Sequence, residues 1–107
     1  MKNITKSLMG TYSVPLILSI LKNSDSYGQQ IAKQANELSN GKINWKGGSL
    51  YPILKKLEAQ NLIKSYWNIT DYDRPRKYLN LLPKGILVLD DYKKELDLFN
   101  NIIHDLS

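Results

Sequence analysis

One stretch of the chain, residues 46–63, constrains its fold and function more than any other. Four apolar residues recur in it at helical spacing, which places them on one side of a helix: Leu50, Ile53, Leu54 and Leu57. Steps of about 100° per residue place a second set on the opposite side: Ser49, Pro52, Lys55, Lys56 and Ala59. The pattern predicts a helix with one face for a core and one cationic face.

Pro52 indicates where this helix begins. A proline costs a backbone hydrogen bond except in the first turn, so we expect the helix to start near Gly48 or Ser49. Its expected end is at residues 60–61. Gly47 and Gly48 leave the beginning of the helix open, so its amides can approach an anion such as a phosphate.

Length and composition exclude several classes of protein. A chain of 107 residues is long enough for one domain with a core. The absence of cysteine excludes disulfides and thiolate metal sites, and a single histidine, His104, leaves little material for acid–base catalysis. We therefore expect no enzyme and no cofactor. The longest apolar run, Val14–Leu21, is too short for a bilayer, so we expect a soluble, cytoplasmic protein without a membrane partner.

The net charge of +5 is unevenly distributed. Residues 1–81 contain twelve Lys or Arg against five Asp or Glu, whereas residues 82–107 contain three against five. The basic part favours a polyanionic partner, although many ordinary domains are basic too. We expect residues 1–81 and 82–107 to do different jobs within one structural unit.

Two helices are predicted in the first forty residues. The first covers residues 2–22, and Pro15 should either kink it or mark a start near Ser13. The second covers residues 27–38, preceded by a capping box of Ser26 and Gln29. Its outer side carries Lys33, and its expected buried stripe is Tyr27, Ile31, Ala35 and Leu38. Residues 39–41 should end it, with Asn40 or Gly41 in the left-handed conformation.

Alternating patterns predict short strands on both sides of the cationic helix. Residues 42–46 can form a very short strand, and residues 62–69 and 76–81 predict a β-hairpin around a polar turn. The tip and return strand of this hairpin carry Arg74, Arg76 and Lys77. The two tryptophans, Trp45 and Trp67, are expected to be core anchors.

The last predicted helix begins at Pro83, a residue suited to the first helical position. A seam with alternating spacings of three and four residues runs along it, as in a coiled coil: Leu89, Tyr92, Leu96, Phe99, Ile103 and Leu106. The seam predicts pairing with a second copy of the chain. The alternative is that this helix folds back on the first helix alone.

Three helices followed by a two-stranded hairpin is the order of a winged helix-turn-helix, in which the third helix enters the DNA major groove. We therefore expect a mostly α, α+β fold with a long C-terminal dimerisation helix. The predicted DNA-binding residues lie on the helices and on the wing: Lys33, Lys46, Ser49, Tyr51, Pro52, Lys55, Lys56, Arg74, Arg76 and Lys77. Tyr51 can equally prop its helix against Tyr27, and Arg74 and Arg76 can pair with Asp71 and Asp73.

Four segments together resemble the PadR family of transcriptional regulators. They are residues 26–31 (Ser-Tyr-Gly-Gln-Gln-Ile), residues 48–58 with their Leu-Tyr-Pro motif, Leu62-Ile63, and residues 74–78 (Arg-Pro-Arg-Lys-Tyr). The resemblance implies a dimeric repressor that binds operator DNA through the 49–56 helix face and the 74–77 wing. The chain is similar to the short branch of the family, whose members end in one long dimerising helix.

This chain departs from the family pattern at two places. Leu82 stands where the family usually has a helix-capping Thr, and the last helix lacks the Trp with which some short members stack flat drugs. The resemblance leaves room for a small-molecule effector of unknown identity and implies a nucleoid-associated location. The competing reading is a winged-helix module that binds protein and uses its basic face only for solubility.

Overall fold

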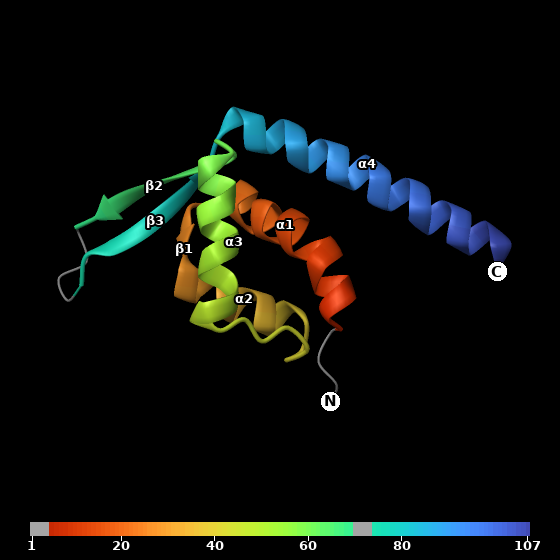
Figure 1. Ribbon diagram of the computed structural model, residues 1–107, viewed down its shortest axis with the longest axis horizontal. Coiled ribbons are helices and arrows are strands. Elements are labelled where there is room, and N and C mark those ends of the chain that lie inside the picture. Colours follow the sequence, from red (N-terminus) through yellow and green to blue (C-terminus); the bar gives the residue numbers. More distant parts are fainter. Residues whose placement is uncertain (1–4, 70–73) are drawn as a thin grey trace.

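The computed structural model describes residues 5–69 and 74–107 of the chain. Along these residues the elements follow in this order: α1 (Lys6–Asn23), β1 (Ser26–Tyr27), α2 (Gly28–Leu38), α3 (Gly47–Ala59), β2 (Ile63–Asn68), β3 (Arg76–Leu81) and α4 (Pro83–Leu106). Figure 1 shows α1 to α3 gathered beside the β2–β3 hairpin and α4 extending away from them. The predicted α+β winged helix-turn-helix with a long last helix is confirmed.

The sheet has three antiparallel strands in the order β1-β3-β2. Residues 63–68 of β2 pair with residues 76–81 of β3, and Tyr27 of β1 lies opposite Tyr78. Strand β1 was not predicted, and it replaces the predicted capping box. The Ser26 hydroxyl donates a 2.7 Å hydrogen bond to the side chain of Gln30, and Tyr27 is the N-cap without a side-chain cap. Ser26 does not cap α2, because Tyr27 occupies the N-cap position and the Ser26 hydroxyl is bonded to Gln30.

Helix α1 runs through the core. Ile17 and Leu18 have no exposed surface and lie in one cluster with Ile31, Leu57 and Ile63. Pro15 lies inside α1, which extends back to Lys6 instead of starting near Ser13, and the ribbon of α1 changes direction along its length (Figure 1). Of the predicted helix 2–22, residues 2–4 lie outside the described part of the chain.

Helix α3 begins at Gly47, one residue earlier than predicted, and ends at Ala59. Pro52 therefore lies in its second turn. Proline has no N–H, so the carbonyl of Gly48, four residues earlier, lacks its usual helical hydrogen bond. Gly48 is exposed, so water can donate a hydrogen bond to this carbonyl instead. The loop before α3 contains no strand at residues 42–46, contrary to the prediction. Asn40 and Gly41 have φ angles of 53° and 84°, as the predicted helix end requires.

Two expected core residues are exposed. Leu38, in the last turn of α2, is 67% exposed, and Trp67, near the outer end of β2, is 64% exposed. Both lie near the end of their element, where no other described part of the chain buries them. Trp45 packs against the core, as predicted.

Helix α4 begins directly after the sheet. Pro83 is its first residue, as predicted, and Leu82 is an N-cap without a side-chain hydrogen bond. The N–H of Leu82 instead donates a 3.0 Å hydrogen bond to the carbonyl of Leu62. Gly85 packs so closely against Leu62 that a Cβ would collide with the Leu62 carbonyl oxygen. None of the helices in the described ranges has the length and apolar content that a bilayer crossing needs.

Candidate nucleic-acid interface

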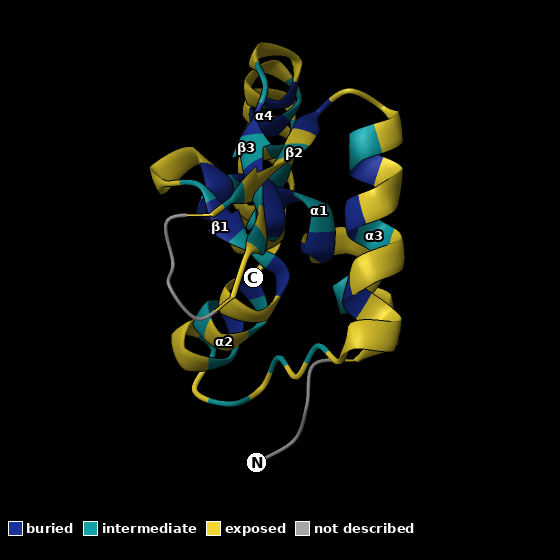
Figure 2. Cartoon of the chain, turned by 90° about the vertical axis from the view of Figure 1, so that its left-hand side faces the viewer, coloured by how far each residue is buried: buried dark blue, intermediate teal, exposed yellow. Residues whose placement is uncertain are grey.

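Helix α3 forms a ridge with a buried inner side and an exposed outer side. Leu50, Leu54 and Leu57 are at most 6% exposed. The outer side carries exposed residues: Gly47, Gly48, Ser49, Tyr51, Pro52, Lys55, Lys56 and Ala59. Figure 2 shows this division, with buried residues on the side of α3 that faces α1. Two lysines thus stand on the open side of a helix whose other side anchors it in the core.

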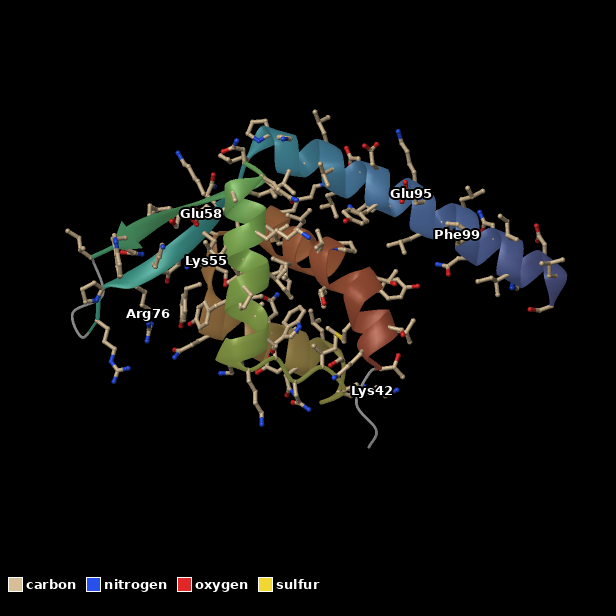
Figure 3. The ribbon with its side chains drawn as sticks, in the orientation of Figure 1. Lys42, Lys55, Glu58, Arg76, Glu95 and Phe99 are labelled. Atoms are coloured by element: carbon tan, nitrogen blue, oxygen red, sulfur yellow. The ribbon has the colours of Figure 1, made fainter. Side chains whose placement is uncertain are left out.

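A hollow of about 300 Å³ separates α3 from the hairpin, and we call it the wing hollow. Lys55 lines it from α3, and Arg74, Arg76 and Lys77 line it from the hairpin. Figure 3 shows Lys55 and Glu58 on the side of α3 that faces the hairpin, with Arg76 nearby. Four of the predicted DNA-binding cations, from segments about twenty residues apart, therefore border one concave surface.

A larger hollow of about 930 Å³ lies on the other side of α3, between α3, α1 and α4, and we call it the bundle hollow. Pro52 and Lys56 of α3 line it together with Lys6 of α1 and Lys84 of α4. The α3 ridge thus divides its lysines, with Lys55 toward the wing hollow and Lys56 toward the bundle hollow.

Ser49 and Tyr51 both make contacts within the chain. The Ser49 hydroxyl accepts a 3.1 Å hydrogen bond from the N–H of Lys46 and donates a 2.9 Å bond to the carbonyl of Lys46. The Tyr51 ring is half exposed and lies against Gly28 and Gly47. Tyr51 therefore packs α3 against Gly28 at the start of α2, whereas the predicted contact was with the preceding residue, Tyr27.

The remaining predicted cations lie apart from the two hollows. Lys33 is exposed on α2 and lines neither of them. Lys46 is exposed at the N-cap of α3 and borders a smaller hollow beside Gly28 and Trp45. Asp71 and Asp73, which could pair with the wing arginines, lie outside the described residues.

Comparison with known protein families identifies this arrangement. The family described as the transcriptional regulator PadR-like family matches residues 17–91. The chain belongs to this family. Its members regulate transcription, bind DNA and are not enzymes, so the expectations of a DNA-binding regulator and of no enzyme are confirmed at the level of the family.

Solved structures of transcriptional regulators resemble this PadR-like chain over most of its length. A PadR family transcription regulator from Clostridium difficile R20291 is 38% identical, with a TM-score of 0.78, and the match covers 89% of this chain and 97% of that one. A transcriptional regulator from Clostridium thermocellum is 28% identical, with a TM-score of 0.83, and the match covers 94% and 97% of the two chains.

A curated relative is longer than this PadR-like chain. Transcriptional regulator YqjI from Escherichia coli K12 is 27% identical over 88 residues, which make up 82% of this chain but only 41% of YqjI. The PadR-like chain therefore matches less than half of that relative's length.

The predicted dimerisation seam of this PadR-like chain divides in the middle of α4. Leu89 has no exposed surface and belongs to the core of the chain, so its predicted contact with a partner is wrong. A side chain enclosed by its own chain cannot contact a partner unless the chain opens. Tyr92 and Leu96 are half buried, and Tyr92 lines the bundle hollow. Phe99, Ile103 and Leu106 are 60%, 62% and 84% exposed.

Sequence reasoning missed one residue at the wing. The Arg76 guanidinium lies over the ring of Tyr27, 4.7 Å from the ring centroid. Tyr27 was predicted as a buried helix residue and as a possible support for Tyr51, not as a partner of Arg76, and it is half buried in β1. Only knowledge of the β1–β3 register brings these two residues together, and a two-residue strand gives no periodic signal in the sequence.

Proposed function

We propose that this chain is a homodimeric, sequence-specific repressor that binds operator DNA through α3 and the wing. Helix α3 enters the major groove, and the hairpin contacts the adjacent backbone or minor groove. The observation that carries the proposal is the wing hollow, around which Lys55 of α3 and three cations of the hairpin border one surface. A convex ridge beside a cationic concavity complements the shape and charge of a duplex groove and its phosphates.

The cations are assigned to phosphates and the ridge to the bases. Lys55 and Lys56 contact phosphates on the two sides of the ridge, because lysine is a point charge without a fixed fork. Arg74, Arg76 and Lys77 contact the backbone or the narrow minor groove, where arginine gains most. Lys33 and Lys46 make peripheral phosphate contacts. Tyr51 and Pro52 lie nearest to the base edges, with Ser49 holding the start of α3 in place.

Dimerisation is proposed through the outer half of α4. The exposed apolar side chains there form a stripe that no described part of the chain covers: Leu98, Phe99, Ile102, Ile103 and Leu106. An apolar stripe of this kind on a projecting helix is typical of a protein interface. In this arrangement residues 1–81 bind DNA and residues 82–107 join the copies, so that two α3 helices reach half-sites about 34–36 Å apart.

The regulatory direction is part of the same proposal. The chain represses in the nucleoid of the cytoplasm and is released by a small molecule or another signal. The bundle hollow gives such a molecule room beside α3.

Footprinting on the DNA upstream of the chain's own gene tests the proposal. We expect protection of two half-sites related by two-fold symmetry, with an affinity that falls steeply as salt is raised. Salt-insensitive binding to an acidic protein, without protection of any duplex, would instead favour the protein-interaction module.

A further inference from the structure

The Tyr27 ring is one end of an aromatic rung that crosses the whole sheet, with Tyr78 at its centre. Tyr27 of β1, Tyr78 of β3 and Tyr66 of β2 lie directly opposite one another in the strand register. The rings of Tyr27 and Tyr78 meet edge to face at 5.3 Å, and those of Tyr78 and Tyr66 stack at 6.0 Å. Arg76 precedes Tyr78 by two residues, on the side of the hairpin turn, and its guanidinium lies over the Tyr27 ring.

The next residue, Gly28, contacts α3. A Cβ at Gly28 would lie 2.9 Å from Cε1 and 3.2 Å from the hydroxyl oxygen of Tyr51. The Tyr51 ring therefore rests on the backbone of Gly28, and any larger residue would displace it. Two consecutive residues at the start of α2 thus contact both DNA-facing elements, the hairpin through Tyr27 and α3 through Gly28.

We propose that Tyr27 and Gly28 are positioning residues that set the placement of the wing relative to α3. The inference deepens the proposed function and rests on it, because placement matters only if both elements meet one duplex. Neither residue needs to touch DNA. Tyr27 acts through Arg76, and Gly28 acts through Tyr51.

The hairpin needs such a support at its outer end. Strand β1 pairs with β3 only at Tyr78 and Leu79, so residues 76 and 77 of β3 extend past the end of β1. A guanidinium over an aromatic ring is attracted by the ring face, and its planar set of N–H donors suits carboxylate or phosphate partners. Holding Arg76 in this way before docking lowers the conformational entropy that is lost when DNA binds.

The first test is a double-mutant cycle on the full chain, with a duplex selected by the wild-type protein from a random-sequence pool. Tyr27→Leu should weaken binding about two- to fivefold per subunit, the range of an exposed cation–π contact, and Tyr27→Phe should restore it. In an Arg76→Ala background, Tyr27→Leu should have no further effect. Equal losses in both backgrounds would show that Tyr27 does not act through Arg76 and would overturn this part of the inference.

A second readout needs no DNA. Protons of a guanidinium over an aromatic ring are shifted by the ring current, so the Nε–H and Cδ–H resonances of Arg76 should move when Tyr27 becomes Leu and stay when it becomes Phe. Resonances that do not change in Tyr27→Leu would mean that the contact is absent in solution, and the inference would fail even if DNA binding were intact.

Gly28 is tested through its partner. Gly28→Ala should lower affinity, because its methyl group displaces the Tyr51 ring. In a Tyr51→Leu background the added methyl group has room, so Gly28→Ala should have no further effect. An unchanged affinity of Gly28→Ala in the wild-type background would overturn the role of Gly28. If the wild-type protein selects no duplex from the pool, the proposed function itself fails, which is a different result from a selected duplex that all variants bind equally.

Discussion

The hydroxyl of Tyr66 donates a 2.6 Å hydrogen bond to a carboxylate oxygen of Asp25, 41 residues earlier in the chain. The other carboxylate oxygen accepts a 2.9 Å hydrogen bond from the side-chain amide of Asn80. Because Asp25 directly precedes β1, one carboxylate joins all three strands of the sheet. The hydrogen bond to Asp25 is also the main cause of a raised pKa of the Tyr66 hydroxyl.

This raised pKa predicts a loss of stability at alkaline pH. The folded pKa of Tyr66 lies above the unfolded value of about 10, so the stability contribution is fully present below that pH. It is lost as the pH rises through the folded pKa. In urea unfolding at pH 8 and above pH 10, wild type should therefore lose more stability than Tyr66→Phe. Tyr12→Phe, at an exposed tyrosine of α1, should behave like wild type. Equal losses in wild type and Tyr66→Phe would contradict the prediction.

The two lysines of the α3 ridge predict the salt dependence of DNA binding. Lys55→Ala with Lys56→Ala should weaken binding to all sequences and reduce the slope of log K against log salt by about 2, because each phosphate contact contributes about 0.9. Titrations at several salt concentrations measure the slope. The matched control is Lys93→Ala with Lys94→Ala, which removes the same charge from an exposed lysine pair on α4. A slope that changes equally in both double variants would assign the effect to net charge alone.

The outer half of α4 predicts the oligomeric state. Phe99→Asp places a charge in the exposed apolar stripe and should weaken the dimer by about 2 kcal/mol or more, as expected for an aromatic residue at the centre of an interface. Sedimentation at micromolar concentration measures this change. Asn101→Asp adds the same charge on the opposite side of α4 and should leave the dimer intact. A wild-type protein that is already monomeric at this concentration would refute the proposed dimer.

Two glycines of the helices predict opposite effects on stability. Gly85→Ala should destabilise the chain by about 1–3 kcal/mol, because its methyl group collides with the carbonyl of Leu62 and the side chain of Leu81. Gly10→Ala should stabilise the chain by about 0.5–1 kcal/mol, because a Cβ there meets no atom of the described residues beyond its own helix and alanine favours a helix. Urea unfolding of both variants at one protein concentration measures the difference. A Gly85→Ala variant as stable as wild type would mean that α4 can move away from Leu62.

Elements with strong local signals could be predicted from the sequence. The residues of β3 and the start of α4 at Pro83 were predicted to the residue, because a polar turn and a proline mark their ends. The buried side of α3 followed from its helical period. Strand β1 could not be predicted, because two residues carry no period and pair only with a strand that comes fifty residues later.

The burial of a side chain depends on which other element packs against it, and a local sequence pattern does not reveal that element. Trp67 alternates in phase with the buried Ile63, yet it lies past the point where the body covers β2. Leu89 fits the coiled-coil seam equally well whether its neighbour is α1 of its own chain or a second copy, because the spacing of three and four residues is the same in both cases. For this reason the period predicted the apolar side of α4 and assigned Leu89 to the wrong neighbour.

Helix α4 follows the last strand after one residue, Leu82, and its first turns are locked to Leu62 and the core. In a dimer held by the outer half of α4, no flexible linker separates the dimer contact from α3 and the wing. The rigid helix would then fix the distance between the two DNA-binding surfaces. Inserting a base pair between the half-sites would lower the affinity, because it changes both their separation and their rotation about the duplex axis.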